Sequence, residues 1–225
     1  MSPQPNRIIL FANGELPDPQ AILSSLAPGD YLVAVDGGLR HLVALSLTPS
    51  LIIGDLDSAD PEDVQIFESQ GVEVRRYPVE KDETDLELAL RVAVDLHPGS
   101  IRVVAALGGR LDQTLGNIFL LTRRQFAATD LRLIDGTQEV FLIRDEVTLN
   151  GKKDQQVSLI PLLGPVPGVK TEGLAYPLNH ETLYPDHTRG ISNRMLSATA
   201  SISIASGLLL CIHEIQKPIE RIGKE

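Results

Sequence analysis

In its first part, the chain alternates short apolar runs with segments of helical periodicity, and this alternation constrains the fold more than any other feature. Six of the apolar runs predict strands, at residues 7–12, 31–35, 51–53, 72–77, 101–107 and 131–134. Several runs lack polar alternation, as strands do when both faces of their sheet are covered. Strands alternating with helices predict a mostly parallel sheet with right-handed crossovers, whose ligand crevice lies outside the carboxyl ends of the strands.

Helices are predicted between the strands at 61–70, 84–96 and about 112–125. The second of these has a well-marked start, because Thr84 and Glu87 have the spacing of a capping box. Residues 1–138 are therefore expected to form an α/β domain with a mostly parallel sheet flanked by helices, of the Rossmann-like type.

The pattern changes near residue 136. Short strands are predicted at 139–143, 146–149, 155–161, 197–204 and 208–214. Residues 205–207 resemble a hairpin connection. Two segments, 162–177 and 176–192, are rich in proline and glycine or in polar residues, which favours loops rather than core elements. These patterns predict a smaller antiparallel β domain over residues 139–225.

Composition excludes several classes of protein. The 225 residues carry a formal net charge of -10 and no run of basic residues, which makes nucleic acid an unsuitable partner. No apolar run approaches the ~20 residues of a membrane span. The single cysteine, Cys211, lies in an apolar run and is expected to be a buried thiol. We expect a cytoplasmic protein, since the N-terminus has no secretory pattern.

Three acidic clusters follow predicted strands at residues 54–58, 81–85 and 108–112. In the first, Asp55 and Asp57 are separated by one residue, so that on a tight turn their carboxylates can converge on a hard divalent cation. The alternative is a turn that the aspartates stabilise by accepting nearby backbone N–H groups. Because all three clusters map to one edge of the sheet, the functional interpretation is stronger for the set than for any one cluster.

The second cluster contains a lysine. Thr84 and Asp85 have an ordinary explanation as an N-cap and an acid in the first helical turn. Lys81, just before them, is either a solvated ion-pair partner or a group that binds a phosphate beside a metal site.

The third cluster combines a glycine pair with an arginine. Gly108 and Gly109 permit unusual φ values and close approach of a phosphate, and Arg110 offers a planar fork to phosphate oxygens. Asp112 is expected to open a helix that carries Asn117. The structural alternatives are a helix cap for Asp112, and a surface polar group or a local backbone partner for Asn117.

A further acid and glycine pair ends the strand at 31–35. Asp36 suits a ribose hydroxyl or another polar nucleotide group, with Gly37 and Gly38 making room, although a plain strand-to-helix turn explains them equally well. The chain has neither a P-loop sequence nor a GxGxxG fingerprint, so any nucleotide site is of another kind.

Taken in order, these motifs resemble those of the thiamine pyrophosphokinase family. The matching segments are residues 36–38, 54–58, 81–85, 108–112 continuing to Asn117, 158–161, 173–178 and 190–193. The resemblance implies an α/β catalytic domain, a β-sandwich domain and a homodimer whose thiamine site lies between subunits. It also implies Mg²⁺-dependent transfer of pyrophosphate from ATP to the thiamine hydroxyl, giving thiamine diphosphate and AMP.

The resemblance assigns roles to particular residues. The implied metal ligands are Asp55, Asp57 and Asp85. The implied ATP-binding residues are Asp36, Gly37, Gly38, Lys81, Thr84, Gly109, Arg110 and Asn117. The implied thiamine-binding residues are Asp112, Ser192 and Asn193, and the implied catalytic residues are Asp85, Asp112, Lys81 and Arg110. Gln113 departs from the histidine common in the family, and the chain has no tryptophan to stack on thiamine.

Three other functions fit part of the pattern. Asp55 and Asp57 after an apolar strand resemble the acid pair of haloacid-dehalogenase-like phosphatases, which leaves the Gly-Gly-Arg and later motifs unexplained. A pyrophosphokinase of similar fold acting on a pterin alcohol is a closer alternative. The third is a non-catalytic regulator that binds nucleotide or thiamine in the same pocket.

Overall fold

The computed structural model describes residues 4–215. The chain divides into two compact units, of which the first ends at Gly136 and the second begins at Thr137. Each unit has its own hydrophobic core, so we describe each by itself. Within the described residues, every helix is too short or too polar to cross a membrane.

The first unit is built on a parallel sheet, as predicted. Its strands are β1 (Arg7–Phe11), β2 (Tyr31–Val35), β3 (Leu51–Gly54), β4 (Glu73–Arg76), β5 (Ser100–Val104) and β6 (Asp130–Ile134). Within the unit they lie in the order β6-β5-β1-β2-β3-β4, and each neighbouring pair is parallel. The central strands β1, β2 and β3 are almost entirely buried, in agreement with their apolar sequences.

Helices connect these strands. They are α1 (Pro19–Ser25), α2 (Leu39–Ala44), α3 (Pro61–Ser69), α4 (Asp85–Asp95) and α5 (Leu111–Leu120). The helices α3 and α4 confirm two predictions, and the Thr84 hydroxyl accepts a hydrogen bond from the backbone N–H of Glu87 at 3.3 Å, as a cap should. Helix α5 ends earlier than predicted, before a separate 3₁₀ turn, η2 (Arg124–Phe126). The short helices α1 and α2 lacked a predicted range of their own.

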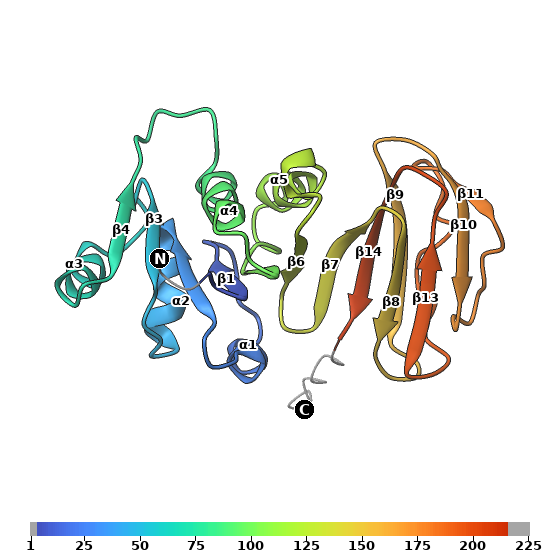
Figure 1. Cartoon of the computed structure of the whole chain (residues 1–225), viewed down its shortest axis with the longest axis horizontal. Helices are drawn as coiled ribbons and strands as arrows, with labels where there is room; N and C mark the ends of the chain where they lie inside the picture. The colour runs from blue at the N-terminus through green and yellow to red at the C-terminus, as the bar shows by residue number, and fades with distance from the viewer. Residues whose placement is uncertain (1–3, 216–225) are drawn as a thin grey trace, which may run out of the picture. The chain divides into compact units, whose positions relative to one another are not determined.

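The connections place the helices in two layers. The crossovers from β1 to β4 put α1, α2 and α3 on one face of the sheet, and the return to β5 and β6 puts α4 and α5 on the other, as Figure 1 shows. On the first face, β1 and β2 contribute Phe11 and Ala34 to a core that includes Ile22 of α1 and Leu39 of α2. The strand order reverses between β1 and β5, which creates a crevice at their carboxyl ends.

The second unit is a sandwich of two antiparallel sheets. Its strands are β7 (Gln138–Ile143), β8 (Glu146–Asn150), β9 (Gln156–Leu162), β10 (Val166–Glu172), β11 (Glu181–Leu183), β12 (Asn193–Arg194), β13 (Thr199–Ser203) and β14 (Leu208–Glu214). One sheet has the order β12-β9-β14-β7 and the other β11-β10-β13-β8. Leu159 and Cys211 of the first sheet share a core with Val169 and Ile202 of the second. The predicted burial of Cys211 is confirmed.

Three predictions for this unit are wrong. Residues 162–177 contain the strand β10, and residues 176–192 contain the strand β11. The register of β10 shifts between Val166 and Val169, which hides the alternation of buried and exposed positions that identifies a strand. Residues 205–207 do not close a hairpin, because β13 pairs with β8 and β10 whereas β14 pairs with β7 and β9 of the other sheet.

Candidate functional site

A cavity of about 500 Å³ opens at the carboxyl ends of the parallel strands, in the crevice that the reversal of strand order creates. Its walls come from the segments that follow β1, β2, β3 and β5, together with the segment that joins β4 to α4. The lining residues include Asn13, Glu15, Asp36, Arg40, Asp55, Val79, Lys81, Thr84, Asp85, Gly109, Arg110, Gln113 and Asn117. All three predicted clusters therefore contribute to one cavity.

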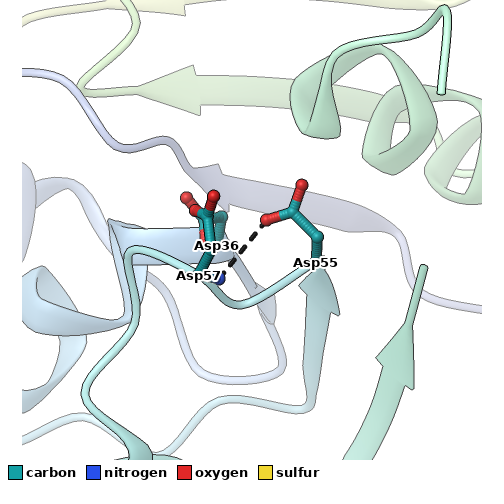
Figure 2. Close-up of side chains that lie close together, drawn as sticks. All are labelled: Asp36, Asp55 and Asp57. Atoms are coloured by element: carbon teal, nitrogen blue, oxygen red, sulfur yellow. Dashed lines mark hydrogen bonds between the residues drawn. The ribbon is translucent and has the colours of Figure 1, made fainter. Parts of the chain in front are cut away.

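Three carboxylates meet at this edge of the sheet. One oxygen from each of Asp36, Asp55 and Asp57 lies within 4.8 Å of the others, and Figure 2 shows the three side chains close together. Leu56 has a φ of 63°, and this left-handed residue folds the turn back so that the Asp57 N–H donates to the Asp55 carboxylate at 3.3 Å. Asp36 is also left-handed, with a φ of 48°, and is buried.

Lys81 links this acidic group to a fourth carboxylate. Its ammonium lies 2.6 Å from Asp55 and 3.1 Å from Asp85, and Asp85 accepts the backbone N–H of Asp55 at 3.1 Å. The hydrogen bond from Lys81 lowers the pKa of Asp55. Burial raises the pKa of Asp85, the charges of Asp55 and Asp36 add to this rise, and Lys81 opposes it. Burial acts to lower the pKa of Lys81, but its two carboxylate partners raise it overall.

The donor set fits a hard divalent cation. Asp36, Asp55 and Asp57 lie close to one another, and Lys81 bridges Asp55 to Asp85. Carboxylate oxygens are ligands that Mg²⁺ prefers. Asp57 is not among the residues that line the cavity. The structure groups Asp36, whose implied role is in ATP binding, with Asp55 and Asp57. Asp85 approaches the group through Asp55 and Lys81.

The segment after β5 forms another wall. Gly108 and Gly109 have φ values of 81° and 66°, which non-glycine residues adopt rarely, so the predicted need for glycine is confirmed. Arg110 lies at the rim, where its guanidinium pairs with Asp112 at 2.6 Å and both side chains are exposed. This hydrogen bond from Arg110 lowers the pKa of Asp112. Asp112 is not among the lining residues, although its neighbour Gln113 is.

Asn117 faces the cavity from the second turn of α5. Its side-chain amide donates to the carbonyl of Ala106 at 2.8 Å, so it holds the end of β5 against the helix. A local backbone partner was one of the two structural alternatives for Asn117. Asn117 is also one of the residues that line the cavity.

Gly37 and Gly38 make room for the protein itself. A Cβ atom at Gly37 would lie 2.5 Å from the Asn13 side-chain oxygen, and one at Gly38 would lie 1.9 Å from the carbonyl oxygen of Phe11. Neither glycine lines the cavity. The two glycines therefore approach other parts of the protein closely, namely the end of β1 and the segment that follows it.

The wall that follows β1 was not predicted from the sequence motifs. Asn13, Gly14 and Glu15 line the cavity, and the Asn13 amide donates to the Asp36 carboxylate at 3.3 Å. Arg40 of α2 and the exposed Val79 were also missed. The available signal was an Asn-Gly pair directly after the first strand, which marks a turn at the edge where the other motifs lie.

Ser192 and Asn193 lie in the second unit. The Asn193 side chain is buried, and it accepts the Tyr176 N–H at 3.0 Å and donates to the Tyr176 carbonyl at 2.7 Å. Ser192 is exposed and left-handed, with a φ of 59°, and its N–H donates to the Ser158 hydroxyl at 3.0 Å. Asn193 thus orders the backbone around Tyr176, while Ser192 is exposed to solvent.

A doubly wound α/β unit with an acidic cavity at its switch point, followed by a β-sandwich, defines a two-part protein whose site suits a divalent cation with phosphate. Two family models match the chain: "Thiamin pyrophosphokinase, catalytic domain" over residues 24–133 and "Thiamin pyrophosphokinase, vitamin B1 binding domain" over residues 144–209. Together they span most of both units. The chain belongs to the thiamine pyrophosphokinase family.

Individual relatives agree with the family models. Thiamine pyrophosphokinase of Bacillus subtilis is 30% identical over 182 residues, which cover 80% of this chain and 85% of the relative. Thiamine pyrophosphokinase 1 of Oryza sativa is 29% identical, with 76% and 68% covered. The crystal structure of the Bacillus subtilis protein superposes with a TM-score of 0.84 at 27% identity, covering 93% of this chain and 99% of that one. Yeast thiamin pyrophosphokinase, at 17% identity and a TM-score of 0.76, shares the fold.

Proposed function

We propose that the protein is a thiamine pyrophosphokinase that transfers a pyrophosphoryl group from ATP to the hydroxyl group of thiamine. The products are thiamine diphosphate and AMP. The observation that carries this proposal is the cavity that Lys81, Arg110 and the carboxylates of Asp36, Asp55 and Asp85 line, with Asp57 beside them, in a unit matched by the family's catalytic-domain model. We assign the catalytic, ATP-binding role to residues 1–138 and the thiamine-binding role to residues 139–225.

Asp55, Asp57 and Asp85 would hold Mg²⁺ in this proposal, and the geometry adds Asp36 to the set. When bound, Mg²⁺ supplies positive charge that offsets the phosphate charge and keeps the phosphate oxygens in place. The ionised state of Asp55, which Lys81 favours by lowering its pKa, is the state that a metal ligand requires.

Cationic and polar side chains would bind ATP. Lys81 carries its charge into the cavity between Asp55 and Asp85, and Arg110 carries a second charge at the rim. Both suit phosphate oxygens, whose negative charge they would neutralise as it spreads during transfer. Thr84, Gly109 and Asn117 complete the phosphate-facing wall, and Asp36 with Gly37 and Gly38 shapes the end of β2 beside it.

The transfer forms a bond between the thiamine hydroxyl oxygen and the β-phosphorus of ATP. The bond between that phosphorus and the oxygen bridging to the α-phosphate breaks, and AMP leaves with the electron pair. The hydroxyl proton needs an acceptor, and Asp112 has this role in our proposal. Its hydrogen bond from Arg110 supports the ionised form that can accept a proton. Asp85, Lys81 and Arg110 act by charge and position.

Thiamine recognition would come from the second unit. Ser192 offers an exposed hydroxyl, and Asn193 fixes the backbone of the segment that carries the exposed ring of Tyr176. The match of residues 144–209 to the vitamin B1 binding domain supports this assignment. We propose in addition that the protein acts as a homodimer with the thiamine site between subunits, which is what the resemblance to the family implies.

Incubation with ATP, Mg²⁺ and thiamine, followed by chromatography, tests the function. We expect AMP and thiamine diphosphate in equal amounts, and loss of both in Asp57→Asn. A pterin alcohol offered in place of thiamine is the matched acceptor control. Turnover of the pterin alcohol alone would identify the other pyrophosphokinase activity, and ATP binding without turnover would indicate a regulator.

A further inference from the structure

An arginine of α2 holds the segment that follows β1. One terminal nitrogen of Arg40 donates to the carbonyls of Asn13 and Gly14, at 2.8 Å and 2.7 Å. The other donates to the carbonyl of Gly37 at 3.0 Å and to the side-chain oxygen of Asn13. The neighbouring His41 contacts the same Gly14 carbonyl at 3.0 Å. The planar guanidinium of Arg40 thus ties the ends of β1 and β2 together.

The Asn13 side chain continues this connection to the acidic group. Its oxygen accepts from Arg40, and its nitrogen donates to Asp36 at 3.3 Å. The other Asp36 oxygen accepts the backbone N–H of Ser58, also at 3.3 Å. Gly37 leaves the space that the Asn13 amide occupies. A contiguous set of hydrogen bonds therefore runs from Arg40 through Asn13 to a carboxylate that lies beside Asp55 and Asp57.

We infer that Arg40 is a positioning residue that acts through Asn13 to orient the Asp36 carboxylate toward the cation site. This inference rests on the proposed function, because it requires the acidic group to hold a metal ion. Arg40 sets the orientation of the Asn13 amide group, because the arginine can only donate and the amide oxygen must therefore face it. The amide nitrogen then points at Asp36 and fixes that carboxylate by a charge-assisted hydrogen bond.

The direction in which cation affinity changes when Arg40 is replaced distinguishes a positioning role from a simple effect of its charge. Arg40 is positively charged and lines the cavity, so removal of its charge alone would strengthen cation binding to the nearby carboxylates. Loss of positioning would weaken it. Arg40→Lys keeps the charge but replaces the fork by one ammonium on a flexible stem, so that the Asn13 amide is no longer held. Groups behind metal ligands typically change metal affinity by about 10-fold to 100-fold.

Arg7 provides a matched control in the same unit. It lies at the start of β1, among the amino ends of the strands and away from the cavity at their carboxyl ends. It donates to Asp30 at 2.7 Å and to the Ser25 carbonyl at 2.9 Å. Like Arg40, it donates to a side-chain oxygen and to a backbone carbonyl, but it does not line the cavity. Arg7→Lys therefore reports what loss of an equivalent structural clamp does to the site.

The test measures binding of Mn²⁺ alone by electron paramagnetic resonance, without nucleotide, so that contacts to ATP do not contribute. We expect Arg40→Lys and Asn13→Ala each to weaken Mn²⁺ binding by about 10-fold. The double variant should bind no more weakly than Asn13→Ala, and Arg7→Lys should bind as the wild type does. Circular dichroism and thermal unfolding establish that each variant is folded.

Three results would overturn the inference. Unchanged or tighter Mn²⁺ binding by Arg40→Lys would remove the positioning role while leaving the proposed metal site in place. Additive losses in the double variant would show that Arg40 acts by a route other than Asn13. Absence of Mn²⁺ binding to the wild type would instead overturn the proposed metal site, and the inference with it.

Discussion

At the scale of single residues, the site depends on backbone conformations that most side chains avoid. Asp36, Leu56 and Ala105 are left-handed residues at the ends of β2, β3 and β5. Such residues cost of order 1 kcal/mol or more and persist where surrounding structure determines them. Here they turn the chain sharply at each strand end, which lets Asp55 and Asp57 face the same neighbour. The strained backbone therefore brings charged groups together.

Gly38 and Gly116 predict opposite effects of one substitution. Gly38 has an ordinary φ of -61°, but a Cβ atom there would lie 1.9 Å from the Phe11 carbonyl oxygen. Gly116 lies in α5 with open space around it. We expect Gly38→Ala to lower the free energy of unfolding by about 1–3 kcal/mol and Gly116→Ala to raise it by about 0.5–1 kcal/mol. Urea titrations of both variants measure this difference, and equal effects would contradict the account.

Asp112→Asn isolates the proton acceptor. The amide keeps the size of the carboxylate and can still accept a hydrogen bond from Arg110, but it is not a base. We expect kcat to fall by about 100-fold or more while the Kd for ATP stays within a factor of about two. Steady-state kinetics and equilibrium ATP binding measure these quantities, and full turnover by the variant would exclude Asp112 as an essential proton acceptor.

At the scale of elements, periodicity and capping signals predicted those strands and helices whose own sequence carries a clear pattern. Strand β2 and helix α4 follow from uninterrupted apolar runs or from a cap at Thr84. Helices α1 and α2 are short, with seven and six residues, so packing on the sheet rather than helical propensity maintains them. The register of strand β10 shifts between Val166 and Val169, and the shift interrupts the alternation of buried and exposed positions, so its own sequence was insufficient.

The ion pair between Arg7 of β1 and Asp30, just before β2, predicts that the stability of the fold depends on pH in the acid range. Burial acts to raise the pKa of Asp30, but hydrogen bonds from Arg7 and the Ala27 N–H outweigh it and lower the pKa overall. A lowered pKa in the folded state stabilises the fold above the unfolded value of about 3.9, and this contribution is lost as the pH falls through the folded value.

Asp30→Asn removes that contribution. We expect the variant to melt at a lower temperature than the wild type at neutral pH, and the difference to shrink as the pH falls below about 4. Calorimetry across this range measures the difference for both proteins. Asp145→Asn, in the second unit, serves as the control for loss of one carboxylate, and a difference for Asp30→Asn that stays constant with pH would contradict the predicted linkage.

At the scale of the whole molecule, the ordered motifs predicted the family and both units, and the parallel sheet explains why three separated clusters share one cavity. The features that could not be predicted from the sequence depend on contacts between distant segments. The wall after β1 and the role of Arg40 depend on hydrogen bonds between segments more than 20 residues apart, such as that from Arg40 to Gly14. Likewise, the hydrogen bonds between the Asn193 amide and the Tyr176 backbone are not revealed by a motif alone, and the contact of Asn193 with thiamine stays a prediction.

Recognition of the two substrates should divide between the two units. We expect Ser192→Ala to raise the KM for thiamine several-fold, roughly the effect of one lost hydrogen bond, and to leave the Kd for ATP unchanged. Asn193→Ala should also lower stability, because it leaves the Tyr176 N–H and carbonyl without their partner. Kinetics at saturating ATP and thermal unfolding separate the two effects. Weaker ATP binding by Ser192→Ala would contradict this division.

The fate of the β-phosphorus of ATP tests the central claim most directly. With ATP labelled at that position, Mg²⁺ and thiamine, the account predicts label in thiamine diphosphate, an equal amount of unlabelled AMP, and neither product from folded Asp57→Asn. Label that remains in ADP, with a singly phosphorylated thiamine, would show transfer of the γ-phosphoryl group alone. Label in free pyrophosphate beside unchanged thiamine would show hydrolysis, and either result would contradict pyrophosphoryl transfer.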